Sequence, residues 1–416
     1  MKRQLTLVGL FFKTSMILNF TRLTTRTPWR WARVIAERLG VWTTEAVVPL
    51  LMPDFEQVAV EGFGPLGLAH LAHLPAAPRG AAALGQGLGD RAGTQAACDG
   101  EARGEAVENG EAYHIPVLEQ EVVDALAPGP GKLMLDGTLG GGGHTKKLLA
   151  SGANVLAMDQ DPAALAWAGA RLEAAADHLI LLRSNFAALP EILEEAGLGP
   201  VLDGMLLDLG VSSHQLDVPE RGFSFMRDGP LDMRMDPDAP ICAADLINGW
   251  PEEELARIFY EYGDEKASRR VAKAIVHRRA EQRFETTADL VAVISSVIPR
   301  RGPSSPATRV FQALRIAVND EMGALEAALA TAHQWLKPGG RLAVITFHSL
   351  EDRIVKQFFR RHSDPEIDRP EWPAPRPNPD CFYRLVTRKG IAASASEQAR
   401  NPRSRSAHLR VVERLA

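Results

Sequence analysis

The stretch from Leu133 to Thr145 constrains the fold of this chain more than any other part of it. Its first residues are apolar up to Asp136, which predicts a short buried strand. Four consecutive glycines, Gly140 to Gly143, let the backbone turn sharply and approach a ligand closely. Thr145 is expected to open a helix. The stretch therefore predicts a strand, a bare glycine loop and a helix start, an arrangement that several cofactors use.

The spacing of the glycines distinguishes between those cofactors. A phosphate-binding loop needs Lys directly before Ser or Thr, but here Lys146 follows Thr145. The dinucleotide pattern G-x-G-x-x-G also fails, because a count from Gly140 puts Thr145 at the last glycine position. A second acid, Asp159, closes the next apolar run, where it can accept hydrogen bonds from ribose hydroxyls. S-adenosylmethionine fits best; the alternative is an α/β turn with incidental glycines and no nucleotide.

Composition places the chain among ordinary globular proteins. It has 416 residues, of which 45% are hydrophobic and 24% charged, enough for two or three domains. A net charge of −5 does not indicate nucleic-acid binding, so any basic surface must be local. Cys98, Cys242 and Cys381 lie far apart, without Cys-x-x-Cys pairs or His clusters. We therefore expect no metal and no disulfide framework, and a reducing, cytoplasmic location without membrane association.

Residues 1–112 differ from the rest of the chain. Met1 to Ala36 carries seven Lys and Arg and no acid, and its apolar run Leu5 to Phe12 is too short to span a bilayer. Pro75 to Ala112 is rich in Ala and Gly, which predicts a flexible linker. We expect a dispensable extension or an upstream start codon; a transit or signal peptide is the alternative.

From Tyr113 onward, apolar runs alternate with helical patterns. Three of the runs end in acids, Asp136, Asp159 and Asp208, and another leads to Phe186. Such strand–helix repeats predict a doubly wound, mostly parallel sheet whose ligand crevice lies beyond the strand tips. These four side chains should therefore point into one cleft.

The next clear strand, Arg341 to Phe347, begins roughly 130 residues after Asp208, far beyond an ordinary crossover. This predicts an inserted helical domain over 213–305, between core parts 113–212 and 306–416, with the long helical pattern from Ala307 to Leu336 belonging to the second part. The helices of the insert are expected at Pro251–Tyr262, Glu265–Gln282 and Thr287–Ile298. The middle helix offers Arg270, Lys273 and Arg278 for phosphate contact; the alternative is a solvated face.

The segment after the fifth strand combines His348, Ser349 and Asp352. Ser-x-x-Asp before an amphipathic helix predicts a capping box, and no Gly-x-Ser-x-Gly nucleophile elbow precedes it. His348 sits at a strand tip, where it could line the cleft. Two terminal strands bring the sheet to seven, and the loop between them carries arginines that could contact phosphates, Arg400, Arg403 and Arg405.

Seven motifs follow one another from Tyr113 to the C-terminus. They are His114–Leu118, Asp136–Thr145, Asp159–Pro162, Asp208–Asp217, Arg221–Phe225, Leu231–Asp236 and Ile345–Asp352. Through them, about three quarters of the chain resembles the bacterial small-subunit (16S) ribosomal RNA (cytosine-N4)-methyltransferase family. The resemblance implies a class I, Rossmann-like methyltransferase fold with seven strands, and S-adenosylmethionine-dependent methylation of a cytosine in the decoding region. It also implies cofactor contacts at Gly142, Gly143, His144, Asp159, Phe186, Asp208 and Gln215.

The chemistry adds further candidates. Cytosine N4 is a poor nucleophile, so an acceptor for its hydrogen would help, and Asp208 is the best-placed carboxylate. The sequence Asp-Leu-Gly-Val after it lacks the Pro-Pro-aromatic of many amino-methylating enzymes, so this role is provisional. Phe223 and Phe225 are candidates to stack on a splayed base, with buried packing as the alternative. Arg234 could meet phosphate or base, or pair with Asp232 or Asp236.

Other functions stay open at this stage. An assembly factor that binds the ribosome without catalysis would predict a damaged cofactor loop, whereas this loop is intact. An enzyme of the same fold acting on another RNA, on DNA or on protein differs only in the family motifs. The expected partner is small-subunit RNA, in an assembled or nearly assembled 30S particle, and a homodimer stays open.

Overall fold

The computed structural model describes residues 116–299 and 305–416. The chain divides into two compact units, Met1–Glu111 and Ala112–Ala416, and the expected N-terminal extension lies outside the described residues. Within the described ranges, every helix is too short or too polar to cross a membrane.

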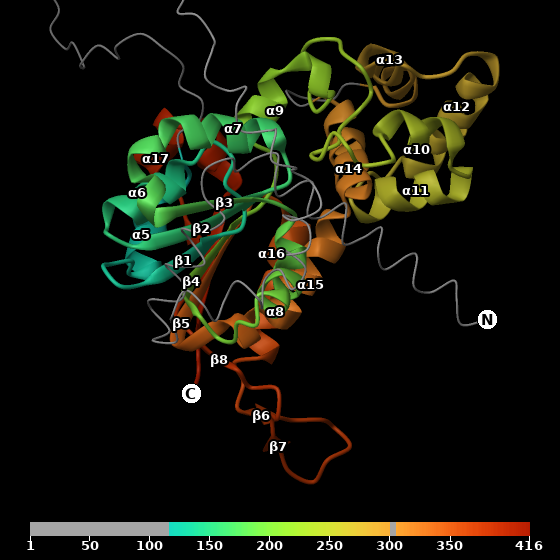
Figure 1. The fold of residues 1–416 in the computed structure, drawn as a ribbon. Helices are drawn as coiled ribbons and strands as arrows, with labels where there is room; N and C mark the ends of the chain where they lie inside the picture. The colour runs from blue at the N-terminus through green and yellow to red at the C-terminus, as the bar shows by residue number, and fades with distance from the viewer. Residues whose placement is uncertain (1–115, 300–304) are drawn as a thin grey trace, which may run out of the picture. The chain divides into compact units, whose positions relative to one another are not determined.

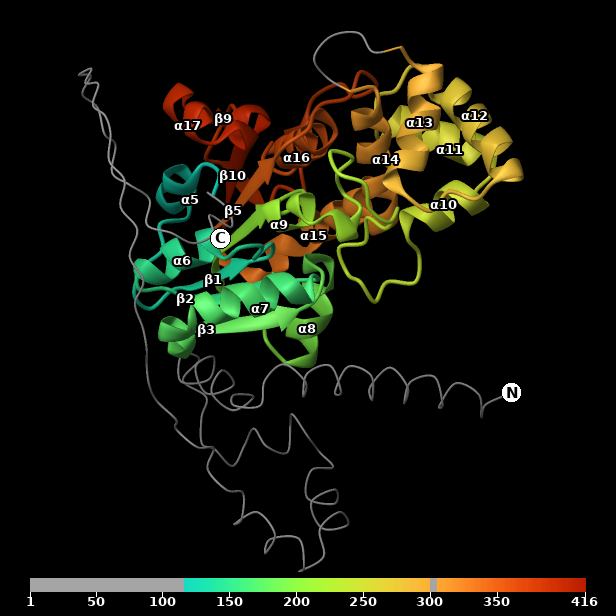
Figure 2. The ribbon, with the colours of Figure 1, turned by 90° about the horizontal axis from the view of Figure 1, so that it is seen from above.

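One large sheet organises the second unit, with strand order β3-β2-β1-β4-β5-β10-β8 and short β9 beside β10 (Figures 1 and 2). β1 to β5 are parallel, whereas β10 runs antiparallel to β5, β8 and β9. This confirms the predicted mostly parallel sheet and adds β9 to the seven expected strands. The strands span Leu133–Asp136 (β1), Asn154–Asp159 (β2), Leu179–Arg183 (β3), Leu202–Asp208 (β4), Leu336–Thr346 (β5), Tyr383–Leu385 (β8), Ile391–Ala392 (β9) and His408–Arg414 (β10).

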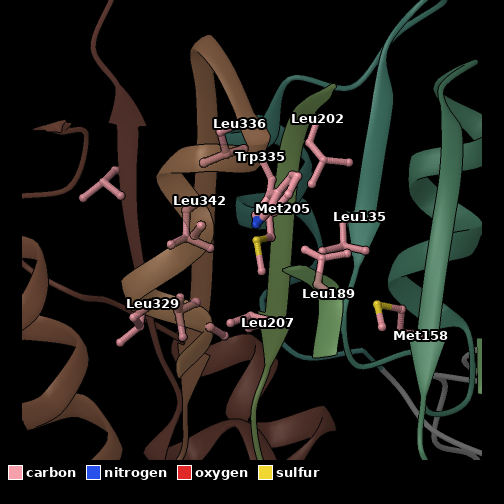
Figure 3. Close-up of a cluster of buried hydrophobic side chains, with 14 of the residues drawn as sticks. Leu135, Met158, Leu189, Leu202, Met205, Leu207, Leu329, Trp335, Leu336 and Leu342 are labelled. Carbon is pink, nitrogen blue, oxygen red and sulfur yellow. The ribbon is translucent and has the colours of Figure 1, made fainter. Parts of the chain in front are cut away.

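Helices cover both faces of this sheet, because its strands are apolar on both sides. One layer consists of α5 (Glu119–Leu126), α6 (Gly143–Ala150) and α7 (Pro162–Arg171). The other consists of α8 (Leu189–Glu195), α15 (Glu321–Trp335) and α16 (Ser349–Arg361). Figure 3 shows the second layer, where side chains of α15 meet alternate residues of β4 and β5.

The helical insert has a hydrophobic core of its own. Its helices α10 to α13 gather into one bundle (Figure 2). They span Ala243–Gly249 (α10), Glu252–Glu261 (α11), Ser268–Glu281 (α12) and Thr287–Val297 (α13). Each of the three helices expected from periodicity is present within three residues of its predicted ends.

The long helical pattern after Ala307 is broken at Asp320, which adopts a left-handed conformation with φ 46°. Helix α14 (Ala307–Asn319) ends there and α15 begins. Buried residues of α14, including Val310 and Leu314, belong to the core of the insert rather than to the sheet domain. We therefore propose that the chain leaves the insert and re-enters the sheet domain at Asp320, not at residue 306.

Shorter elements complete the second unit. α9 (Ser213–Asp217) follows β4, and a two-stranded ribbon, β6 (Glu366–Ile367) with β7 (Arg376–Pro377), extends beyond α16 (Figure 1). α17 (Ala395–Arg400) and a 3-10 turn, Pro402–Ser406, connect β9 to β10.

Candidate functional site

A cleft of about 300 Å³ lies beyond the carboxyl tips of β1, β2 and β4. Residues of the glycine loop, the three strand tips, α9 and the junction between α14 and α15 line it. All four residues expected to meet in one cleft lie at this edge of the sheet. Asp159, Phe186 and Asp208 line the cleft, and Asp136 lies just beneath it with 1% of its surface exposed.

The glycine loop needs its glycines for two different reasons. Gly140 and Gly142 have φ values of 49° and 77°, in the left-handed region that glycine adopts without strain. At Gly143 the reason is space, because a Cβ would lie 2.7 Å from Pro116 Cγ. Helix α6 begins at Gly143, two residues before the expected Thr145. The loop therefore presents bare backbone to the cleft.

Asp136 and Thr145 hold the loop from below. Thr145 Oγ1 donates to Asp136 Oδ2 at 2.6 Å, and Thr138 N donates to Oδ1 at 3.2 Å. Burial raises the pKa of Asp136, although these hydrogen bonds counteract it. Asp136 thus ties the strand tip to the start of α6 and acts on the cleft only through the loop.

Asp159 forms the acidic tip of β2. Its Oδ2 accepts from Gly140 N at 2.8 Å and its Oδ1 from Asp161 N at 2.8 Å. Burial is the largest influence and raises the pKa of Asp159 to about 6, although these two backbone bonds lower it. The carboxylate therefore orders the glycine loop, and the residue also lines the cleft.

His144 and Asp208 form a buried pair at the centre of the cleft. His144 Nε2 lies 3.5 Å from Asp208 Oδ2, with side-chain exposures of 7% and 14%. Burial alone would lower the pKa of His144, but the carboxylates of Asp208 and Asp136 outweigh it and raise the pKa. His144 Nδ1 and Nε2 and Asp208 Oδ1 are all buried without a hydrogen-bond partner, so the contact between Nε2 and Oδ2 is ionic only. Buried polar atoms of this kind normally have a hydrogen-bond partner, so a polar ligand is expected here.

Gln215 lines the cleft, but its amide is fully engaged by the protein. Oε1 accepts from Ser212 N at 3.0 Å and closes the N-terminal cap of α9, while Nε2 donates to Asp161 Oδ2 at 3.0 Å. Asp161 also binds Arg221 Nη1 at 2.6 Å. Gln215 therefore shapes the cleft wall by fixing α9 to the start of α7.

The far wall of the cleft comes from the insert junction, which the sequence interpretation missed. Arg315 of α14 reaches over Asp320 and binds Glu321 through Nε and Nη2 at 2.7 and 2.8 Å. Asn319 Oδ1 accepts from Met235 N at 2.7 Å. The sequence pattern did not predict these residues at the cleft, because the break at Asp320, which brings them there, was not predicted.

Two expected base-stacking candidates are core residues of the insert. Phe223 is 7% exposed and packs in the hydrophobic cluster, with Arg221 over its ring at 5.8 Å. Phe225 is partly buried and meets Phe311 edge-on at 4.9 Å. Packing against helices occupies both rings, so the structure favours the packing interpretation.

Arg234 pairs with Asp232, the alternative that the sequence left open. Nε and Nη2 donate to the two oxygens of Asp232 at 2.9 and 2.7 Å, and Nη1 donates to Ala239 O. The Asp232 bond is the largest influence and raises the pKa of Arg234. Arg234 therefore stabilises the loop that precedes α10.

The predicted capping box at Ser349 is wrong in its register. His348 is the N-cap of α16: its Nδ1 accepts from Glu351 N at 3.4 Å. Glu351, 1% exposed, accepts in return from Phe347 N at 2.8 Å and His348 N at 3.2 Å. His348 Nε2 lies 3.0 Å from Glu351 Oε1, so both ring nitrogens face the cap. His348, expected from the sequence to line the cleft as a substrate contact, caps α16 and is not among the residues that line the cleft, whereas Glu351 is. Substrate contact by His348 stays a prediction.

The basic helix α12 is only partly free to bind a ligand. Arg270 and Lys273 are exposed. Arg278, in contrast, donates to Gln282 O and Oε1 at 2.8 Å and lies over the ring of Phe284. Arg278 therefore closes the end of the helix.

Known proteins were compared with the whole chain. Residues 111–415 match the MraW methylase family. The chain belongs to this family. Relatives named ribosomal RNA small subunit methyltransferase H include those of Heliobacterium mobile and Symbiobacterium thermophilum, each 50% identical, and Heliobacterium modesticaldum, 48% identical. Each match covers 73% of this chain. It covers 100% of the Heliobacterium mobile relative, 97% of the Symbiobacterium thermophilum relative and 99% of the Heliobacterium modesticaldum relative.

The methyl donor of this methylase is S-adenosylmethionine, and the cleft has the features that such a ligand needs. Bare backbone at Gly140, Gly141 and Gly143 lines the cleft and allows close approach. Asp159 offers a carboxylate at the tip of β2, and the unpartnered atoms of His144 and Asp208 offer polar contacts. Among the described residues, no group of His, Cys, Asp and Glu is arranged to hold a metal ion.

Proposed function

We propose that this chain methylates N4 of a cytosine in the decoding region of small-subunit ribosomal RNA. The names of relatives about 50% identical over nearly their full length support ribosomal RNA of the small subunit as substrate. The motifs shared with the cytosine-N4 family support the base and the atom. The observation that carries the chemistry is the buried Asp208 Oδ1, which faces the cleft without a hydrogen-bond donor.

We assign the cofactor to the residues of the cleft edge. S-adenosylmethionine supplies an electrophilic methyl group on a sulfonium. Asp159 would bind the ribose hydroxyls, and His144 would meet a polar group of the ligand through Nδ1. The remaining assigned contacts are Gly143, Phe186, Asp208 and Gln215, the last acting through α9 as its two amide bonds indicate. Gly142, also expected from the sequence, is not among the residues that line the cleft and packs against Ala168 of α7, so we assign it to the shape of the loop.

Asp208 is assigned to the amino group of the target base. The N4 lone pair is delocalised into the ring, so a hydrogen-bond acceptor at N4 favours the geometry in which nitrogen attacks. One N4 proton must leave as the N–C bond forms, and a carboxylate at this place can take it. His144 at 3.5 Å holds the other oxygen of Asp208 in position.

Methyl incorporation tests this proposal. The full chain is incubated with labelled S-adenosylmethionine and small subunits isolated from cells that lack the gene, and with naked RNA from the same particles. We expect N4-methylcytidine in the assembled or nearly assembled particle. Asp208→Asn, which offers a donor where an acceptor is needed, should lower kcat by about 100-fold. Transfer to protein, or to a carbon of the base, would refute the assignment.

A further inference from the structure

A second hollow lies beside the cleft, on the outer face of α16. It has a volume of about 310 Å³ and is lined by Ser349, Asp352, Arg353, Lys356, Gln357 and Arg360. Arg353, Lys356 and Arg360 are exposed and recur at three- and four-residue spacing, so they follow one face of the helix. None of these three side chains takes part in an ion pair or hydrogen bond within the part of the chain that the structure describes.

The one acid in this hollow is already neutralised. Asp352 accepts from Arg410 Nε at 2.7 Å and from Arg410 Nη2 at 2.9 Å. Burial raises the pKa of Asp352, but Arg410 outweighs it and lowers the pKa overall. The three exposed cations therefore face a groove without a free carboxylate. This differs from α11, where Arg257 is paired with acids of its own helix.

The groove and the cleft share the first turn of α16. Phe347 and Glu351 line the cleft, whereas Ser349 and Asp352 line the groove. The groove follows the exposed face of α16 and Glu351 lies on its buried face, so a strand leaving the groove would enter the cleft around the N-terminal end of the helix. The cations from Arg353 to Arg360 extend over about 10 Å at 1.5 Å per residue. A stacked nucleic-acid strand presents about three phosphates over that length.

We infer that the α16 groove, defined by Arg353, Lys356 and Arg360, binds the phosphate backbone of the RNA strand whose target nucleotide enters the cleft. This inference rests on the proposed RNA substrate and names a binding surface that the sequence interpretation assigned elsewhere. Cations on one helix face suit a phosphodiester backbone, which is recognised through charge and not through base sequence. The groove would thus supply affinity and position while the cleft supplies specificity.

The test is charge reversal in the full chain, Arg353→Glu with Lys356→Glu and Arg360→Glu. The matched control reverses Lys146, Arg388 and Lys389, which are exposed outside α16 and change the net charge equally. Both variants, and the wild type, are titrated with unmethylated small subunits at several salt concentrations. Calorimetry with S-adenosylmethionine shows whether each variant keeps the fold of the cleft.

We expect the groove variant to raise KM for the subunits at least 10-fold and to keep kcat at saturation within about two-fold. Its log–log salt slope should flatten by about two units, since each single-strand contact contributes about 0.7. The control should keep the wild-type slope. A groove variant that matches the control would overturn the inference.

Different results would refute the proposed substrate and the proposed role of the groove. If the wild type does not methylate the subunits, the proposed substrate is wrong, and the same variants are then titrated with a single-stranded oligoribonucleotide. Weaker binding by the groove variant alone would keep the groove as a phosphate site for another RNA. Equal binding by all three proteins would remove it.

Discussion

Asp159 combines two roles that depend on its charge: it orders the glycine loop through Gly140 and faces the cleft. Because its pKa is raised to about 6, chiefly by burial, the carboxylate takes up a proton as pH falls through that value. Only the ionised form is a full acceptor for ribose hydroxyls. We predict that protonation of Asp159 weakens affinity for S-adenosylmethionine progressively as pH falls below about 6, apart from any change due to His144, whose pKa is also raised.

The substitution Asp159→Ala should weaken binding by about 1.5 to 3 kcal/mol at pH 7.5, since a charged acceptor is lost. It should also remove the contribution of Asp159 to the pH dependence between pH 5 and 7. Calorimetry across that range measures both effects. A folded Asp159→Ala variant with wild-type affinity would show that the ribose is held elsewhere.

His348 offers a residue-scale test of whether it caps α16 or contacts RNA. Loss of an N-cap side chain costs about 0.5 to 2 kcal/mol, and Asn is a good cap. We predict that His348→Ala lowers the free energy of unfolding by about 1 kcal/mol and that His348→Asn restores most of it. Denaturant titration gives these values. If both variants are as stable as the wild type but bind subunits weakly, His348 contacts RNA and does not stabilise α16.

At the scale of elements, α12 and the glycine loop should act independently, because they belong to different hydrophobic cores. Arg270→Glu with Lys273→Glu changes two exposed cations and leaves the helix-closing Arg278 intact. We predict unchanged affinity for S-adenosylmethionine and a salt slope for subunit binding lowered by about 0.7 per lost contact.

His144→Ala should do the opposite, since it removes the partner of Asp208 and a polar contact of the cleft. Cofactor calorimetry and a salt titration on each variant separate the two effects. If the α12 variant keeps the wild-type slope, α12 is a solvated face and RNA binding passes to the α16 groove and Arg403.

Much of the element structure could be predicted because it follows from local patterns. Apolar runs ending in Asp136, Asp159 and Asp208 mark strand tips, and periodicity marks helices. The break at Asp320 could not be predicted, because a non-glycine residue in a left-handed conformation leaves the apolar pattern uninterrupted. For that reason the far wall of the cleft, with Arg315 and Asn319, was missed.

The cofactor-binding residues at the strand tips could be predicted from the sequence, because the carboxyl ends of parallel strands meet at one edge of the sheet. The substrate-binding residues were harder to predict, because tertiary packing decides which side chains remain exposed. Phe223 and Arg234 lie in two of the seven motifs and are of residue types that often contact RNA. In the structure, however, Phe223 packs in the core of the insert and Arg234 pairs with Asp232. An arginine or aromatic side chain in a motif thus indicates importance without showing whether its task is binding or packing.

At the scale of the whole molecule, the family match begins at residue 111, one residue before the second compact unit, which starts at Ala112. The Ala- and Gly-rich stretch before it cannot contribute much packing. We predict that a chain beginning at Glu111 keeps its melting temperature and its methyl-transfer rate. Loss of soluble protein on truncation would instead indicate that the N-terminal residues dock on the enzyme, through Trp29, Trp31 or Leu39.

The central claim concerns the whole molecule: its cleft transfers a methyl group to one cytosine N4 in small-subunit RNA. Small-subunit RNA is isolated from cells with the gene, without it, and with the Asp208→Asn variant, and modified nucleosides are mapped by mass spectrometry. We predict N4-methylcytidine at a single decoding-region position, present only with the active gene. An identical modification map in all three strains, or a difference at another atom or RNA, would contradict this account.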